Sequence, residues 1–117
     1  MPITNALAGI MVNNLDAAVE WYEKVLDRPA DRRPMEGLAE WQMPDGGWIQ
    51  VYEDKERAGF SSVTFAVKGF EDQLEHLEAK AIPVEATTRS DYVKTATVKD
   101  PSGNRVVFAE LNDQPLR

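Results

Sequence analysis

The chain has 117 residues, of which 43% are hydrophobic and 28% charged, the balance of an ordinary globular domain. Its net charge of −7 would repel a phosphate backbone, so nucleic acid is not expected as a partner. No apolar run is long enough to cross a membrane, and the absence of cysteine excludes disulfides and thiolate metal sites. The amino-terminal segment lacks the features of a secretory signal, so we expect a cytoplasmic protein. The acidic balance serves solubility and mildly favours a positively charged small molecule as ligand.

The first half of the chain predicts a strand, a helix and three further strands. Residues 3–13 read as a buried strand, and Asn14 is a plausible N-cap for a helix that Pro29 ends. Apolar residues from Leu15 to Leu26 recur at helical spacing. The turn "PDGG" joins the last two predicted strands. The predicted elements are the helix at 15–27 and the strands at about 30–35, 38–43 and 48–54.

The second half repeats this order. An alternating strand, "SSVTFAVKG", precedes a helix at 70–82 that Pro83 ends, and "DPSG" joins the last two strands. A shift of about 55–57 residues superimposes Leu15 on Phe70 and Glu53 on Glu110. The later strands are predicted at about 84–88, 92–99 and 104–111. We therefore predict an α+β fold in a single domain, 1–117, built from two βαβββ modules at 1–57 and 58–117.

Strand alternation sorts the residues onto two faces of the predicted sheet. One face, which includes Ile49 and Val51, is aliphatic and is expected under the helices. If "PDGG" is a four-residue loop, Trp41 pairs with Gln50 and Met43 with Trp48. The other face is then a mixed apolar and polar wall, the composition of a small-molecule cleft or of a surface that packs on another subunit. The candidate ligand-binding residues are Leu7, Trp41, Met43, Trp48, Gln50, Tyr52, Ser62, Thr64, Arg105 and Val107.

Two segments resemble the vicinal oxygen chelate superfamily, which includes glyoxalase I, extradiol dioxygenases and bleomycin-resistance drug-binding proteins. They are "VNNLDAAVEWYEKVL" after the first strand and "VKDPSGNRVVFAEL" at the closing hairpin. The resemblance covers nearly the whole chain. It implies that the two modules form a cupped, mostly antiparallel sheet with helices on the outer face, and that the protein is a homodimer.

Many enzymes of this superfamily hold a divalent metal, and the resemblance places the ligand positions at Leu7, Gln50, Ser62 and Val107. Only Gln50 offers a usable donor, a neutral amide oxygen. A 2-His-1-carboxylate site cannot form because the chain has one histidine, His76. We therefore expect neither a metal nor another cofactor.

The leading hypothesis is a metal-free protein that holds a planar hydrophobic or cationic compound in an aromatic cleft, for drug sequestration or resistance. Trp41, Trp48 and Tyr52 would stack on the compound, and polar side chains would orient it. Catalytic residues are not identified, because no carboxylate falls at the alternating positions of the predicted cleft strands. Two alternatives stay open. One is a lyase, isomerase or dioxygenase-like enzyme of the same superfamily, and the other is a module whose aromatic face binds a protein partner.

Overall fold

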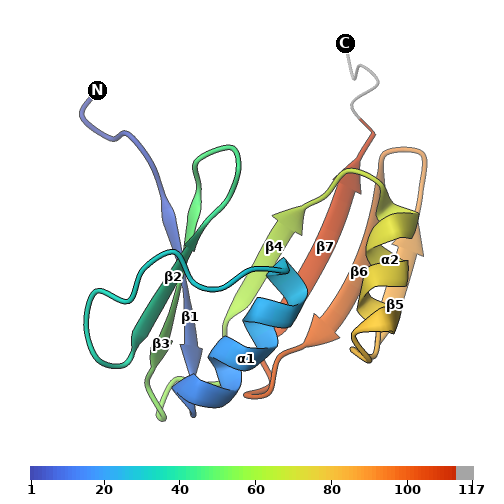
Figure 1. The fold of residues 1–117 in the computed structure, drawn as a ribbon. Helices are drawn as coiled ribbons and strands as arrows, with labels where there is room; N and C mark the ends of the chain where they lie inside the picture. Colours follow the sequence, from blue (N-terminus) through green and yellow to red (C-terminus); the bar gives the residue numbers. More distant parts are fainter. Residues whose placement is uncertain (113–117) are drawn as a thin grey trace. The chain divides into compact units, whose positions relative to one another are not determined.

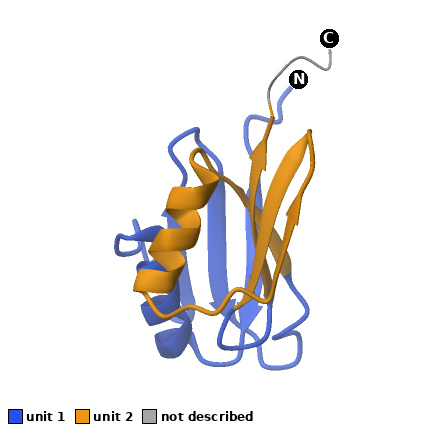
Figure 2. Ribbon diagram, turned by 90° about the vertical axis from the view of Figure 1, so that its right-hand side faces the viewer, with its two compact units in different colours: residues 1–61, 100–104 blue, residues 62–99, 105–117 orange. Residues whose placement is uncertain are grey.

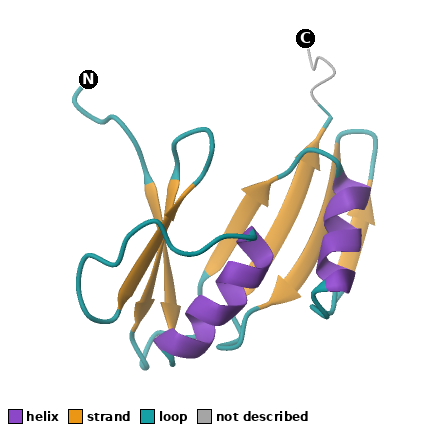
Figure 3. Ribbon diagram, in the orientation of Figure 1, coloured by secondary structure: helices purple, strands orange, loops and turns teal. Residues whose placement is uncertain are grey.

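The structure is a computed structural model that describes residues 1–112 and divides into two compact units (Figure 2). The first unit comprises Met1–Ser61 and Asp100–Asn104, and the second comprises Ser62–Lys99 and the chain from Arg105 onward. Each unit contains one helix and one sheet (Figure 3), which confirms the predicted α+β class. Within residues 1–112, neither helix combines the length and apolar composition needed to cross a membrane.

The first unit is a three-stranded sheet with one helix (Figure 1). The sheet has the order β1-β3-β2, with β1 parallel and β2 antiparallel to β3. The predicted strand at 30–35 is wrong, because this segment forms only an isolated bridge, Arg32 to Glu40. Pro34 interrupts the segment, and proline has no N–H to donate to a longer ladder. The elements are β1 (Leu7–Val12), α1 (Leu15–Leu26), β2 (Leu38–Gln42) and β3 (Trp48–Glu53).

Helix α1 forms where the sequence predicts it. The Asn14 side chain accepts a hydrogen bond from the Ala17 N–H at 3.0 Å, which caps the amino terminus. The helix ends where Asp27 adopts a left-handed conformation, with φ of 59°. The apolar stripe is buried and packs against β3 in the first unit. Its buried members are Leu15, Ala18, Val19, Tyr22 and Val25.

The second unit is a four-stranded sheet with one helix. Its order is β4-β7-β6-β5, in which β4 is parallel to β7 and the other pairs are antiparallel. Helix α2 packs against β6 and β7, and the rings of Phe65 and Phe108 stack at 5.9 Å between centroids. The observed strands lie close to the predicted ones. The elements are β4 (Ser62–Ala66), α2 (Phe70–Ala79), β5 (Ala86–Arg89), β6 (Val93–Lys99) and β7 (Arg105–Leu111).

The internal repeat is visible as an equivalent contact in each unit. In the first unit, the Glu53 carboxylate accepts a hydrogen bond from the Leu15 N–H at 3.0 Å, at the start of α1. In the second, the Glu110 carboxylate accepts from the N–H groups of Gly69 and Phe70 at 3.1 and 3.0 Å, at the start of α2. Each carboxylate satisfies N–H groups that have no partner within the helix. Each unit therefore ties its last strand to the start of its own helix.

The Glu110 contact predicts a pH-dependent stability. Backbone hydrogen bonds from Gly69 and Phe70 hold the pKa of Glu110 below its ordinary value of 4.5. A carboxyl whose pKa is lowered by folding stabilises the protein above the unfolded pKa, and this contribution is lost as pH falls through the folded pKa. Glu110→Gln is therefore expected to lower the melting temperature at pH 7, with a gap from wild type that narrows as pH falls below 4.5 and closes below the folded pKa. Melting curves across this pH range check it, with Glu75→Gln on the exposed face of α2 as control. A gap of constant size at every pH would contradict the assignment.

Residues 100–104, the loop "DPSGN", are joined to the first unit by buried polar contacts. One Asp100 carboxylate oxygen accepts from the Tyr22 hydroxyl at 2.8 Å and from Asn104 Nδ2 at 2.9 Å. The other accepts from the N–H groups of Ser102 and Asn104. Asn104 is fully buried and also donates to the Met11 carbonyl at 2.7 Å. Burial and the neighbouring Asp100 charge raise the pKa of Tyr22, so the hydroxyl keeps its proton and acts as a donor.

Candidate functional site

Strand register in the first unit aligns side chains in rows across the sheet. Gly9 pairs with Gln50, Gln50 pairs with Glu40, and Glu40 pairs with Arg32. Paired residues share a face, so this row lies on the side of the sheet opposite the buried Ile49 and Val51. We name this side the Gln50 face. It comprises Leu7, Gly9 and Met11 of β1, Trp48, Gln50 and Tyr52 of β3, and Leu38, Glu40 and Gln42 of β2.

The structure corrects the predicted positions of Trp41 and Met43. Trp41 pairs with Ile49 rather than with Gln50, and its side chain is fully buried on the aliphatic face. Its ring centroid lies 6.1 Å from that of Tyr22 on α1. Met43 lies beyond the end of β2, where its N–H donates to the Gly47 carbonyl. Neither residue belongs to the Gln50 face.

The cause of this error is the length of the hairpin loop. The Gly46 N–H donates to the Met43 carbonyl at 2.9 Å, so the turn itself comprises Pro44, Asp45 and Gly46. Gly46 has a φ of 105°, the left-handed conformation that closes a three-residue hairpin. A loop with an odd number of residues reverses the parity expected from four. It exchanges the two faces of β2, so that Glu40 and Gln42 replace Trp41 and Met43 on the Gln50 face.

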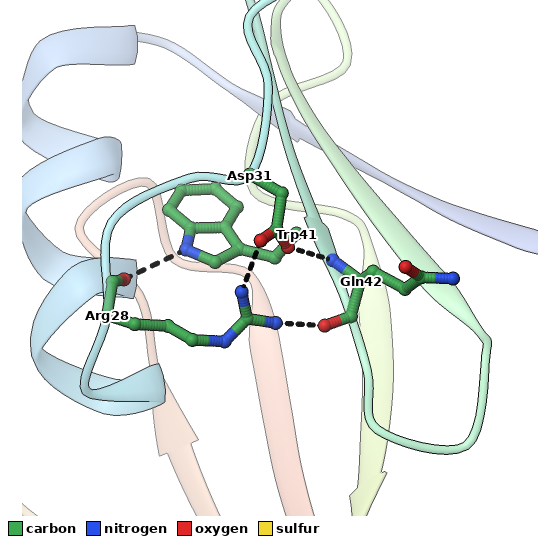
Figure 4. A network of polar contacts seen from close by, with 4 residues as sticks. All are labelled: Arg28, Asp31, Trp41 and Gln42. Carbon is green, nitrogen blue, oxygen red and sulfur yellow. Dashed lines mark hydrogen bonds and ion pairs between the residues drawn. The ribbon is translucent and has the colours of Figure 1, made fainter.

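A polar network holds the chain between α1 and β2 in place (Figure 4). Arg28 pairs with Asp31 at 2.6 Å and also donates to the Gln42 carbonyl. The other Asp31 oxygen accepts from the Gln42 N–H at 2.6 Å, and the Trp41 indole N–H donates to the Arg28 carbonyl at 3.0 Å. Hydrogen bonds from Arg28 and Gln42 hold the pKa of Asp31 below its usual value. This network sets the position of the next residue along the chain, Arg32.

The Gln50 face carries a connected group of side chains, which comprises Arg32, Glu40, Trp48 and Gln50. Glu40 Oε1 accepts from Arg32 Nε at 2.5 Å, and Oε2 accepts from Gln50 Nε2 at 2.6 Å. The guanidinium carbon of Arg32 lies 4.1 Å from the centroid of the Trp48 ring. Burial alone would raise the pKa of Glu40, but hydrogen bonds from Arg32 and Gln50 and the Arg32 charge hold it below its ordinary value. The group therefore contains a buried, ionised carboxylate, and the expectation that these strands carry no carboxylate is wrong.

The Gln50 face continues into a hollow at the β1 side. A Cβ on Gly9 would lie 3.4 Å from the Tyr52 ring, so the missing side chain lets this ring approach the backbone. The hollow has a volume of about 390 Å³, within the range of small-molecule sites. Its lining residues are Gly9, Met11, Glu56, Arg57, Phe60 and Ser61.

A larger hollow of about 660 Å³ lies near the start of α1. It is lined mainly by charged and polar residues such as Arg33, Glu36 and Lys55. We therefore place the candidate site on the Gln50 face.

The remaining predicted site residues belong to the second unit. Ser62 pairs with Arg105, and Thr64 pairs with Val107, so all four share one face of the β4–β7 pair. Ser62, Thr64 and Arg105 are exposed, whereas Val107 is only 6% exposed. Their role in binding stays a prediction.

The residues at the four metal positions implied by the superfamily do not fit its donor set. In the first unit, Leu7 has no lone pair, and Gln50 offers only a neutral amide oxygen, while its Nε2 donates to Glu40. In the second, Val107 is hydrocarbon and Ser62 offers only a neutral hydroxyl. Within residues 1–112, no three His, Cys, Asp or Glu side chains form a group that could hold a metal ion.

The two units define an α+β protein. In each unit, the strand before the helix pairs in parallel with a strand that follows the helix. Residues 4–108 match the family model of the Glyoxalase/Bleomycin resistance protein/Dioxygenase superfamily. The chain therefore belongs to this superfamily. Among proteins of curated function, none matches the sequence.

Solved structures share the fold. The glyoxalase / bleomycin resistance protein from Catenulispora acidiphila is 26% identical, with a TM-score of 0.85 over 93% of this chain and 99% of that one. Lactoylglutathione lyase from Agrobacterium tumefaciens is 19% identical, with a TM-score of 0.79 over 93% and 94% of the two chains. Oxidase ChaP-H2 is 11% identical, with a TM-score of 0.76 over 94% of each chain. The last two similarities establish the fold alone, because lyases and oxidases differ in chemistry.

Proposed function

We propose that the protein binds a planar organic molecule on the Gln50 face without using a metal ion, as a sequestering or resistance protein would. The observation that carries this proposal is the make-up of β3. Ile49 and Val51 are buried, whereas Trp48, Gln50 and Tyr52 lie part-exposed on the other side of the strand. Two aromatic rings flanking an amide suit a flat compound that needs stacking and one polar contact.

The adjoining hollow supports the same proposal. Its lining includes the apolar side chains of Met11 and Phe60, and Phe60 is 86% exposed. A compound that extends from Tyr52 over Gly9 would cover this apolar surface. The resemblance to drug-binding members adds the proposal that the protein is a homodimer, which light scattering would test.

The test is binding of a panel of planar aromatic compounds, measured by calorimetry and by the shift in melting temperature. Trp48→Ala is expected to weaken binding about tenfold, because stacking on tryptophan contributes about 0.5–2 kcal/mol. Trp21→Ala, on α1, is the matched control and should bind as wild type does. If no compound in the panel binds, or if both variants lose affinity equally, the proposal is wrong.

Elemental analysis gives an independent test of the metal-free part. Protein purified without a chelator is expected to contain less than stoichiometric zinc, nickel, iron and manganese. A stoichiometric divalent metal would contradict this part and favour an enzyme of the superfamily.

A further inference from the structure

Arg32 lies on the Gln50 face as a ligand would. Its planar guanidinium stacks over Trp48 at 4.1 Å and pairs with Glu40 at 2.5 Å. An aromatic ring on one side and a carboxylate at the edge are the two contacts that a planar cation requires. The contacts of Arg32 therefore indicate that this surface can bind a planar, positively charged group.

The two partners in this ion pair differ in how firmly they are held. The Glu40 side chain is 3% exposed, lies on a strand and has a second hydrogen bond from Gln50. The Arg32 side chain is 53% exposed, and its backbone pairs with β2 through an isolated bridge instead of a strand ladder. The contacts of Arg28 and Asp31 hold the backbone of this segment, whereas the exposed guanidinium of Arg32 lies over Trp48 and pairs with Glu40. Glu40 is therefore the fixed half of the pair, and Arg32 is the half that a competing cation can replace.

Glu40 also explains why the surface needs a cation. A buried carboxylate without a partner costs several kcal/mol, so an ionised Glu40 requires a positive group beside it. A neutral compound that displaced Arg32 would leave Glu40 uncompensated. A planar cation would restore the charge pair and the stacking contact together.

We propose that Trp48 and Glu40 form a subsite for a planar cation, an amidinium, guanidinium or protonated heteroaromatic amine, and that Arg32 is its internal occupant. This inference rests on the proposed function and specifies the charge of the ligand. It makes Arg32 a competitor that lowers the apparent affinity in proportion to the fraction of molecules in which it covers the subsite. The net charge of −7 favours the same class of ligand.

The test compares benzamidine, a planar cation, with benzamide, its neutral analogue, by calorimetry. Arg32→Ala removes the competitor and is expected to raise the affinity for benzamidine at least tenfold, with little change for benzamide. Arg33→Ala is the matched control, because it removes the same charge from the neighbouring residue without touching Glu40. Adding Glu40→Gln to Arg32→Ala is expected to cancel the gain.

Arg32→Lys covers the case in which Arg32→Ala folds poorly. Lysine keeps the charge but lacks the planar fork, so the affinity for benzamidine should fall between those of wild type and Arg32→Ala. If Arg32→Ala and Arg32→Lys bind benzamidine no better than wild type, the inference is wrong. Equal binding of benzamidine and benzamide by every variant would also overturn it, while leaving the proposed function intact. The proposed function fails on its own test, when no planar compound binds or when Trp48→Ala and Trp21→Ala lose affinity equally.

Discussion

Trp41→Ala is expected to lower the free energy of unfolding by about 3–5 kcal/mol, the cost of emptying a large aromatic site in a core. Trp41 is fully buried, contacts the Tyr22 ring and donates its indole N–H to the Arg28 carbonyl. Its loss would leave a cavity next to α1 and an unpaired carbonyl. Urea denaturation followed by circular dichroism measures the change.

Trp48→Ala is the matched control for this prediction. Trp48 lies on the Gln50 face and is part-exposed, so its loss is expected to cost about 1 kcal/mol. The two variants should therefore have different effects: Trp41→Ala mainly lowers stability, whereas Trp48→Ala mainly weakens binding. Equal destabilisation by the two variants would show that the register of β2 against β3 is wrong.

Asp100→Ala is expected to cost a similar amount, about 3–5 kcal/mol. The change removes the acceptor for the Tyr22 hydroxyl, the Asn104 amide and two backbone N–H groups. Each buried donor left without a partner costs about 1–3 kcal/mol, and these costs are not fully additive. Denaturation with urea again gives the measurement.

Two variants make the Asp100 prediction specific. Tyr22→Phe removes one donor and leaves the other contacts of Asp100 in place, so it should cost about 1–2 kcal/mol. Asp45→Ala removes an exposed aspartate from the other hairpin turn and should be nearly neutral. An Asp100→Ala variant no less stable than Asp45→Ala would mean that the loop 100–104 does not hold the first unit together.

Local signals in the sequence predicted most of the fold. Helix α1 follows from an N-cap at Asn14 and a regular apolar stripe, and the strand, helix and strand hairpin of the first half recur in the second half, which has one further strand. The repeat placed Glu53 and Glu110 at equivalent positions, and each of these carboxylates accepts hydrogen bonds at the start of the helix of its own unit. These features depend on neighbouring residues or on a regular spacing, so they can be predicted from the sequence.

The candidate site was harder to predict because it depends on one loop. Glu40 and Trp41 exchange faces if the turn after them contains four residues instead of three, and "PDGG" is compatible with both. The position of Arg32 depends on side-chain contacts of Arg28 and Asp31 that spacing does not reveal. The available signal for the shorter loop was the sequence "PDGG" itself. Its first glycine can close a three-residue turn, which leaves the second glycine to pair with the opposite strand.

The assignment of Asp100–Asn104 to the first unit bears on how the chain could be divided. A polypeptide starting at residue 58 would carry Asp100 and Asn104 but lack Tyr22 and Met11, which complete their hydrogen bonds. Two separately expressed halves would thus each present unmatched polar groups until they associate. Fragment complementation, rather than independent folding of either half, is the behaviour that this connectivity favours.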